Sequence, residues 1–145
     1  MTTTTHKRSV HIDAPVETVF NYAKDPHHFY EAFPEKGRPV LVEVKTTPEG
    51  VGSTYKWEDS MFMIHIKGTV TRESCIPNER IVDHSSTGPV WTYTFEPDQT
   101  GTTLSLACEV SSKVPLADKV IDRVAWDGDR DLDTVLANMK KAIEA

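Results

Sequence analysis

The chain has 145 residues, of which 38% are hydrophobic, and a formal net charge of −6. This length and composition suit a single compact domain over residues 1–145, with a core large enough to fold without disulfides or metal. The acidic balance argues against nucleic acid or an anionic membrane surface as a partner, because both attract clustered Lys and Arg. No apolar run is long enough for a transmembrane segment, and the only cysteines are Cys75 and Cys108, so we expect a reducing, cytoplasmic location.

The N-terminal part of the chain predicts a strand followed by two short helices. Residues 6–12 are expected to form the strand. Asp13 is expected to cap the first helix, with Pro15 in its first turn, and the Asp-Pro pair at residues 25–26 separates it from a second helix over residues 27–33. One face of the first helix is apolar and is expected to be buried: Val16, Val19, Phe20 and Ala23.

Beyond residue 39, apolar residues recur at every second position, which is typical of half-buried strands. Short turns separate these strands, so we expect neighbours to pair antiparallel. Gly68 lies inside one strand and could mark a bulge, which would change the residues that face the core. The expected strands cover residues 40–45, 53–60, 62–74, 80–86, 90–96 and 102–111.

From residue 115 to residue 144 the period returns to 3.6, which predicts one long amphipathic helix. Its apolar stripe has only the concave side of the sheet to pack on. Gly128 lies near the middle of the stripe, where it would leave a void for a ligand, kink the helix, or let helix and sheet approach closely. The stripe consists of Leu116, Val120, Val124, Leu132, Val135, Met139 and Ile143.

Aromatic residues on the apolar strand faces are the main candidates for ligand binding, with simple core filling as the alternative. Two carboxylates are also placed on such faces, since Asp59 shares a face with Tyr55 and Asp83 shares one with Ile81. A buried carboxylate is costly unless it is paired, so either one would indicate function. The predicted ligand-binding residues are Tyr55, Trp57, Trp91, Tyr93, Val124 and Gly128.

We expect no cofactor and no metal. The acidic stretch at residues 127–133 lacks the glycine and glutamate positions of a calcium-binding loop. The six histidines show no ligand spacing, and no nucleophile, phosphate-loop or dinucleotide motif is present.

Several segments carry a resemblance to a known family through their order and spacing. They are residues 10–20 (VHIDAPVETVF), 25–26 (DP), 33–34 (FP), 52–57 (GSTYKW), 77–81 (PNERI), 91–97 (WTYTFEP), 101–102 (GT), and 130–132 (RDL) through 139–141 (MKK). Together they resemble the START-like (SRPBCC) superfamily, in particular its polyketide cyclase/dehydrase and lipid transport family.

The resemblance implies an α+β helix-grip fold of the START/Bet v 1-like type. In it, a seven-stranded antiparallel sheet wraps around a long C-terminal helix, with two short helices after the first strand. It also implies a cavity between sheet and helix that binds an apolar or amphipathic small molecule, either a lipid or a polyketide-like compound. A homodimer is left open beside the monomer.

The alternative function is that of an enzyme, namely a polyketide cyclase, aromatase or dehydratase. Cyclases similar to this chain place an arginine and a hydroxyl residue in the cavity, from the strand before a proline-containing turn. The comparable stretch is residues 69–74, and the resemblance puts Glu73 rather than Arg72 at the position of that arginine. The candidate catalytic residues are Arg72, Glu73, His65 and Asp83.

Overall fold

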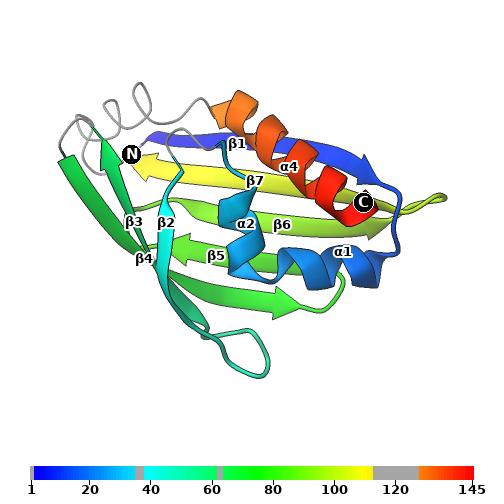
Figure 1. Ribbon diagram of the computed structural model, residues 1–145, viewed down its shortest axis with the longest axis horizontal. Coiled ribbons are helices and arrows are strands. Elements are labelled where there is room, and N and C mark those ends of the chain that lie inside the picture. The colour runs from blue at the N-terminus through cyan, green and yellow to red at the C-terminus, as the bar shows by residue number, and fades with distance from the viewer. Residues whose placement is uncertain (1, 35–37, 62–63, 113–127) are drawn as a thin grey trace.

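The computed structural model describes residues 2–34, 38–61, 64–112 and 128–145, which form a curved sheet with helices on its concave side (Figure 1). In chain order the elements are β1 (Thr2–Ile12), α1 (Val16–Ala23), α2 (Pro26–Glu31), β2 (Val40–Lys45), β3 (Thr54–Met61), β4 (Ile64–Ile76), β5 (Arg80–Ser85), β6 (Val90–Pro97), β7 (Thr102–Ser112) and α4 (Gly128–Glu144).

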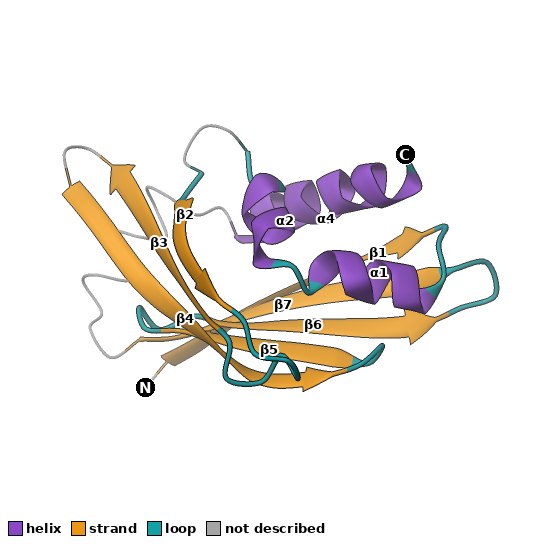
Figure 2. Cartoon of the chain, turned by 60° about the horizontal axis from the view of Figure 1, so that its bottom comes forward, coloured by secondary structure: helices purple, strands orange, loops and turns teal. Residues whose placement is uncertain are grey.

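All strand pairs are antiparallel, and the sheet has seven strands in the order β1-β7-β6-β5-β4-β3-β2. Strands β2 to β7 follow one another as a meander, and β1 is paired with β7, so β1 and β2 are the two edges. Figure 2 shows the helices lying against one face of this sheet, which we call the inner face. The predicted layout of a seven-stranded antiparallel sheet, two short helices and a C-terminal helix is confirmed.

The start of α1 differs from the prediction. Pro15, and not Asp13, is the N-cap residue of α1, and no side chain caps this helix. The Asp13 carboxylate instead lies 2.7 Å from His11 Nε2, so it is engaged by the strand and not by the helix. The second helix begins at Pro26 with Asp25 as its N-cap, in agreement with the Asp-Pro signal.

The described part of the C-terminal helix carries the predicted apolar stripe. Leu132, Val135 and Met139 are 0% exposed, and Leu136 is 1% exposed. The helix α4 packs mainly on β1 and also contacts β7, α1 and α2 (Figure 2). The remainder of the predicted helix, residues 115–127, falls in a segment that lies outside the described residues.

The central strands alternate as the sequence predicts, with one face buried. Tyr93 and Phe95 of β6 are 2% and 3% exposed, and Leu104 and Leu106 of β7 are both 0% exposed. Together with the apolar faces of α1, α2 and α4, these side chains form one core between the sheet and the helices.

The edge strand β2 does not keep simple alternation, because its register against β3 shifts between Leu41 and Glu43. As a result Leu41 and Val44 both pack against the core. Val40 and Val42 face solvent and are 61% and 51% exposed.

Gly68 is not the site of a bulge, since it pairs in continuous register with Trp57 of β3. A Cβ atom at Gly68 would stand 2.7 Å from Cζ2 of the Trp57 indole. The absence of a side chain therefore lets the indole lie against the backbone of β4. The register shift of β4 occurs further along, between Arg72 and Ser74, where it pairs with β5.

The turn between β6 and β7 packs against the corner where β1 leads into α1. A Cβ atom at Gly101 would stand 2.1 Å from the Ile12 carbonyl oxygen and 3.0 Å from the Ala14 backbone nitrogen. The Thr102 hydroxyl donates a hydrogen bond of 2.9 Å to the Ala14 carbonyl. Because the atoms contacted at Gly101 belong to the backbone, only glycine allows this close approach.

We therefore expect Gly101→Ala to lower the free energy of unfolding by about 1–3 kcal/mol, the usual cost of overpacking. Urea denaturation measures this change. The wild type is the reference, because the positive φ of 119° at Gly88 would add backbone strain of its own to any alanine variant there. A Gly101→Ala protein as stable as the wild type would contradict the close packing of this corner.

His11 lies between two carboxylates near the end of β1. Its Nδ1 is 2.7 Å from Asp98 Oδ2, and its Nε2 is 2.7 Å from Asp13 Oδ1. An acceptor at each ring nitrogen favours the imidazolium, which has two N–H donors. Hydrogen bonds to Asp13 and then to Asp98 raise the pKa of His11 above 6.5. Lys140 Nζ of α4 donates a hydrogen bond of 2.7 Å to the His11 carbonyl, so the helix is tied to the same corner.

Because the folded-state pKa of His11 lies above its ordinary value of 6.5, its stabilising contribution is complete below pH 6.5 and is lost as the pH rises through the folded pKa. We expect the His11 ring signals in NMR spectra to titrate above pH 6.5. The stability difference between the wild type and His11→Gln should shrink over the same pH range. A His11 pKa at or below 6.5 would contradict this arrangement.

Candidate functional site

Two buried charged residues, Arg72 of β4 and Asp83 of β5, form an ion pair on the inner face of the sheet. Their side chains are 6% and 3% exposed. Arg72 Nε donates to Asp83 Oδ1 at 2.8 Å and Nη2 donates to Oδ2 at 3.1 Å, which is a two-point contact. Arg72 Nη1 donates to the Lys24 carbonyl at 2.8 Å. The pair therefore joins two strands to the junction between α1 and α2.

The strand register places Arg72 on the inner face. Val70 of β4 pairs with Tyr55 of β3, and both side chains are buried, so the residue two positions after Val70 also faces inward. Glu73 faces outward, with 52% of its side chain exposed and Oε1 2.9 Å from His84 Nδ1. This orientation reverses the expectation from the sequence, which put Glu73 at the position of the inward-facing arginine.

Three tyrosines lie within reach of the Asp83 charge. The Tyr55 hydroxyl donates a hydrogen bond to Asp83 Oδ2. The Tyr55 ring centroid lies 5.9 Å from the Arg72 guanidinium carbon and 6.2 Å from the Tyr30 ring. Burial raises the pKa of Tyr30, Tyr55 and Tyr93, and the negative charge of Asp83 raises it further. All three phenols therefore stay neutral near pH 7.

The charge of Arg72 is retained in this buried setting. Burial on its own would lower the pKa of the guanidinium, but the hydrogen bonds and the charge of Asp83 raise it above its ordinary value. The guanidinium and the carboxylate therefore form an ion pair without net charge at the centre of the inner face.

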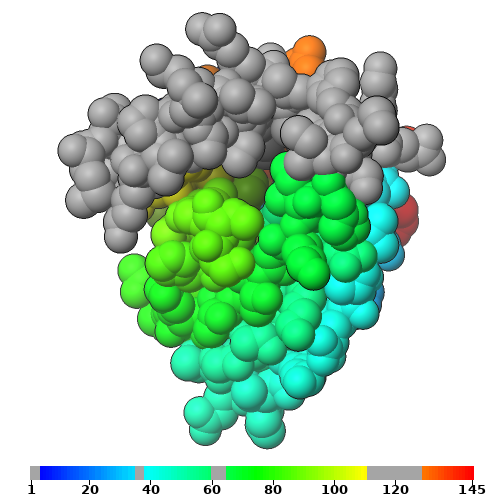
Figure 3. All heavy atoms as spheres, turned by 90° about the vertical axis from the view of Figure 1, so that its left-hand side faces the viewer, coloured from blue at the N-terminus to red at the C-terminus, as the bar shows by residue number. Residues whose placement is uncertain are grey.

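The inner face also has an aromatic end, which we define by Trp57 of β3 and Trp91 of β6. Both side chains pack against the core but are only partly buried. The Trp91 ring contacts Phe29 and Phe33 with centroid distances of 5.1 and 6.3 Å. At this end β3 and β4 extend beyond the helices (Figure 2), and the surface is recessed between β3–β4 and the turn that leads into β6 (Figure 3).

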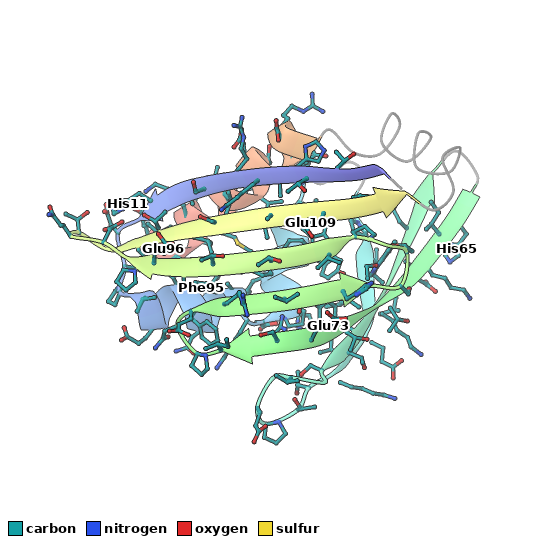
Figure 4. The ribbon with its side chains drawn as sticks, turned by 180° about the vertical axis from the view of Figure 1, so that it is seen from behind. His11, His65, Glu73, Phe95, Glu96 and Glu109 are labelled. Carbon is teal, nitrogen blue, oxygen red and sulfur yellow. The ribbon has the colours of Figure 1, made fainter. Side chains whose placement is uncertain are left out.

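The structure separates the candidate catalytic residues into two groups. Arg72 and Asp83 are brought together on the inner face. Glu73 and His65 lie on the outer face, seen from behind in Figure 4. His65 has 54% of its side chain exposed, and its Nε2 is 3.6 Å from Glu58. These two residues are therefore turned away from the core.

The predicted ligand-binding residues also occupy different positions. Tyr55 and Tyr93 are 4% and 2% exposed, so they belong to the buried inner face. Trp57 and Trp91 form the aromatic end. Two further candidates come from the predicted C-terminal helix: Gly128 is the first residue of α4, and Val124 lies outside the described residues.

Sequence reasoning missed two members of the polar cluster, Tyr30 and the Lys24 carbonyl. Tyr30 comes from α2, and its contact with Tyr55 depends on how this helix lies on the sheet, for which no local pattern exists. The Lys24 carbonyl does have a signal, because the last carbonyls of a helix need donors from outside it. Lys24 is the C-cap of α1.

Within the described ranges, no group of three or more His, Cys, Asp or Glu side chains could hold a metal ion. No helix in this part of the chain is long and apolar enough to cross a membrane.

A curved antiparallel sheet that holds a C-terminal helix against its inner face, with two short helices after the first strand, defines a protein of the helix-grip class. A model of the family described as polyketide cyclase / dehydrase and lipid transport matches residues 3–144. The chain belongs to this family, as its sequence motifs predicted, and thus to the START-like superfamily. A search of curated proteins found no match.

Solved structures agree with this fold at low sequence identity. The Zhui aromatase/cyclase from Streptomyces sp. R1128 is 14% identical, with a TM-score of 0.72 over 99% of this chain and 94% of that chain. A protein from Chromobacterium violaceum is 22% identical, with a TM-score of 0.62 over 98% of this chain and 99% of that chain. A protein from Thermus thermophilus is 18% identical, with a TM-score of 0.64 over 98% of this chain and 97% of that chain.

We expect Asp83→Asn to lower the free energy of unfolding by about 3–5 kcal/mol, because it leaves the Arg72 charge buried without its partner. Urea denaturation tests this. Glu73→Gln is the matched control, since it removes a carboxylate from an exposed pair and should cost less than about 1 kcal/mol. Replacing both partners, as Arg72→Met with Asp83→Asn, should cost less than the sum of the single changes. Equal losses for Asp83→Asn and Glu73→Gln would contradict the buried pair.

Proposed function

We propose that the protein binds an apolar or amphipathic small molecule, lipid or polyketide-like, between the inner face of the sheet and the C-terminal helix. One observation carries this proposal. Trp57 and Trp91 point to the inner face yet stay only partly buried, whereas Tyr55 and Tyr93, two positions away on the same strands, are 4% and 2% exposed.

Partly covered indoles on a core face leave apolar surface in contact with water when the protein is empty. Apolar surface gains about 25 cal/mol for each Å² removed from water, so a ligand that covers the indoles would be stabilised by that contact. Ligand sites are mostly apolar and aromatic, with a few polar groups that fix orientation. The aromatic end next to the Arg72–Asp83 pair has this composition.

Gly68 supports the same proposal. Without a side chain at this position, the Trp57 indole can lie flat against β4. A larger residue would push the indole toward the helices and fill the space that a ligand would use. Glycine inside a strand weakens the strand, so its presence here is consistent with a role in shaping the inner face.

A second candidate function is that of a cyclase or dehydratase. It is favoured by the inward orientation of Arg72 and by the structural similarity to the Zhui aromatase/cyclase. We prefer ligand binding because Asp83 and the Lys24 carbonyl already accept three hydrogen bonds from the Arg72 guanidinium. An enzyme would convert a polyketide-like compound that it binds, whereas a carrier would bind the compound and release it unchanged.

We also infer that the chain works as one domain in the cytoplasm. Cys75 and Cys108 are both free thiols, which suits a reducing compartment. Elements from both ends of the chain, β1 and α4, pack on each other, which supports one folding unit.

The test is binding of the neutral apolar dye N-phenyl-1-naphthylamine to the wild type and to two variants. Trp57→Ala and Trp91→Ala should each weaken binding by about tenfold or more, because each removes apolar aromatic surface that the ligand would cover. Val42→Ala, which shortens an apolar side chain that is 51% exposed on β2, is the control and should leave binding unchanged. Unchanged affinity in both tryptophan variants would mean that the dye does not bind at the aromatic end, and it would contradict the proposal.

A further inference from the structure

Tyr93 lies next to the aromatic end and is more deeply buried than Trp91. On β6 it follows Trp91 by two residues, so both side chains face inward. Tyr93 pairs with Ile81 of β5 and Leu106 of β7, and the Phe29 ring of α2 lies 5.8 Å from its ring. The side chain is therefore enclosed by strands below and by α2 above, next to the partly covered surface of Trp91.

The Tyr93 hydroxyl has no hydrogen-bond partner among the described residues, although the residue is only 2% exposed. The neighbouring Tyr55 hydroxyl differs, since it donates to Asp83. Leaving a buried hydroxyl unpaired is unfavourable, and most such groups in proteins are satisfied. An unpaired donor beside the proposed ligand position is therefore a candidate for contact with the ligand.

The surroundings of Tyr93 decide the charge of the group it can bind. Among the described residues, the charged side chains in the buried class are Arg72 and Asp83, which neutralise each other. A carboxylate or phosphate placed here would meet no unpaired buried cation. It would also be repelled, because the charge of Asp83 acts on the Tyr93 hydroxyl more strongly than the charge of Arg72 does. A carbonyl, hydroxyl or ether oxygen would carry no such penalty.

We propose that the Tyr93 hydroxyl donates a hydrogen bond to an uncharged oxygen of the ligand, so that the site selects neutral ketones, alcohols, esters or phenols over carboxylates. This inference rests on the proposed function, because it assigns a ligand class to the same inner face. Burial and the charge of Asp83 raise the pKa of Tyr93, so the phenol keeps its proton for this role.

The experiment uses three probes with the same ring system: naphthalene, 2-acetylnaphthalene and 2-naphthoate. Each displaces N-phenyl-1-naphthylamine from the full chain, and the dissociation constants are compared. We expect 2-acetylnaphthalene to bind about tenfold more tightly than naphthalene, the effect of one buried hydrogen bond. The anion 2-naphthoate should bind more weakly than both.

Tyr93→Phe should weaken binding of 2-acetylnaphthalene to the level of naphthalene and leave naphthalene itself unchanged. Tyr22→Phe is the matched control, because Tyr22 lies in α1 with its ring stacked on His28, and it should change none of the three constants. If naphthalene binds but Tyr93→Phe does not affect the ketone, or if 2-naphthoate binds most tightly, this inference is wrong and the proposed function stands. If neither the dye nor any probe binds, the proposed function fails.

The stability of the ligand-free protein gives a second, independent readout. Removing an unpaired buried hydroxyl should leave the thermal midpoint unchanged or raise it, so Tyr93→Phe should be at least as stable as the wild type. A clear loss of stability would mean that the hydroxyl has an internal partner, and it would overturn the assignment.

Discussion

The ion pair between Arg72 and Asp83 is the contact on which the arrangement of the inner face depends. Two charges that are 6% and 3% exposed have lost most of their hydration, which costs several kcal/mol per ion unless geometry and hydrogen bonds compensate. Compensation here requires three elements at once, since β4 supplies Arg72, β5 supplies Asp83 and the end of α1 supplies the Lys24 carbonyl. The pair thus ties the junction between α1 and α2 to the sheet.

The same pair sets the chemistry of the inner face. Because Asp83 neutralises Arg72, the centre of the face is polar without net charge. Burial, helped by the charge of Asp83, raises the pKa of the surrounding phenols and so keeps them neutral. Beyond this centre, Trp57 and Trp91 offer apolar surface that is only partly covered. We infer that a neutral polar floor next to an aromatic end suits a largely apolar molecule with few oxygens, which agrees with the lipid and polyketide chemistry in the family's description.

Much of the fold could be predicted because the spacing of apolar residues along the chain indicates which segments are strands or helices and which face of each is buried. Alternation placed Tyr93 and Leu104 on the buried face, and the 3.6-residue stripe placed Leu132 and Met139 against the sheet. The orientation of Arg72 could not be predicted, since it depends on the pairing of β4 with β3 and on a bulge that lies after Arg72 and not at Gly68. Contacts between α2 and the sheet have no local sequence signal either, so the cluster around Asp83 became visible only in three dimensions.

The central claim is that the inner face holds a neutral, largely apolar molecule. Native mass spectrometry of the full chain purified from the organism that encodes it, followed by organic extraction and identification of the bound material, tests this most directly. We predict an added mass that survives gentle ionisation and is extracted as an uncharged compound with a small number of oxygens. A protein that carries no added mass, and also fails to bind lipid or polyketide-like compounds offered afterwards, would contradict the claim.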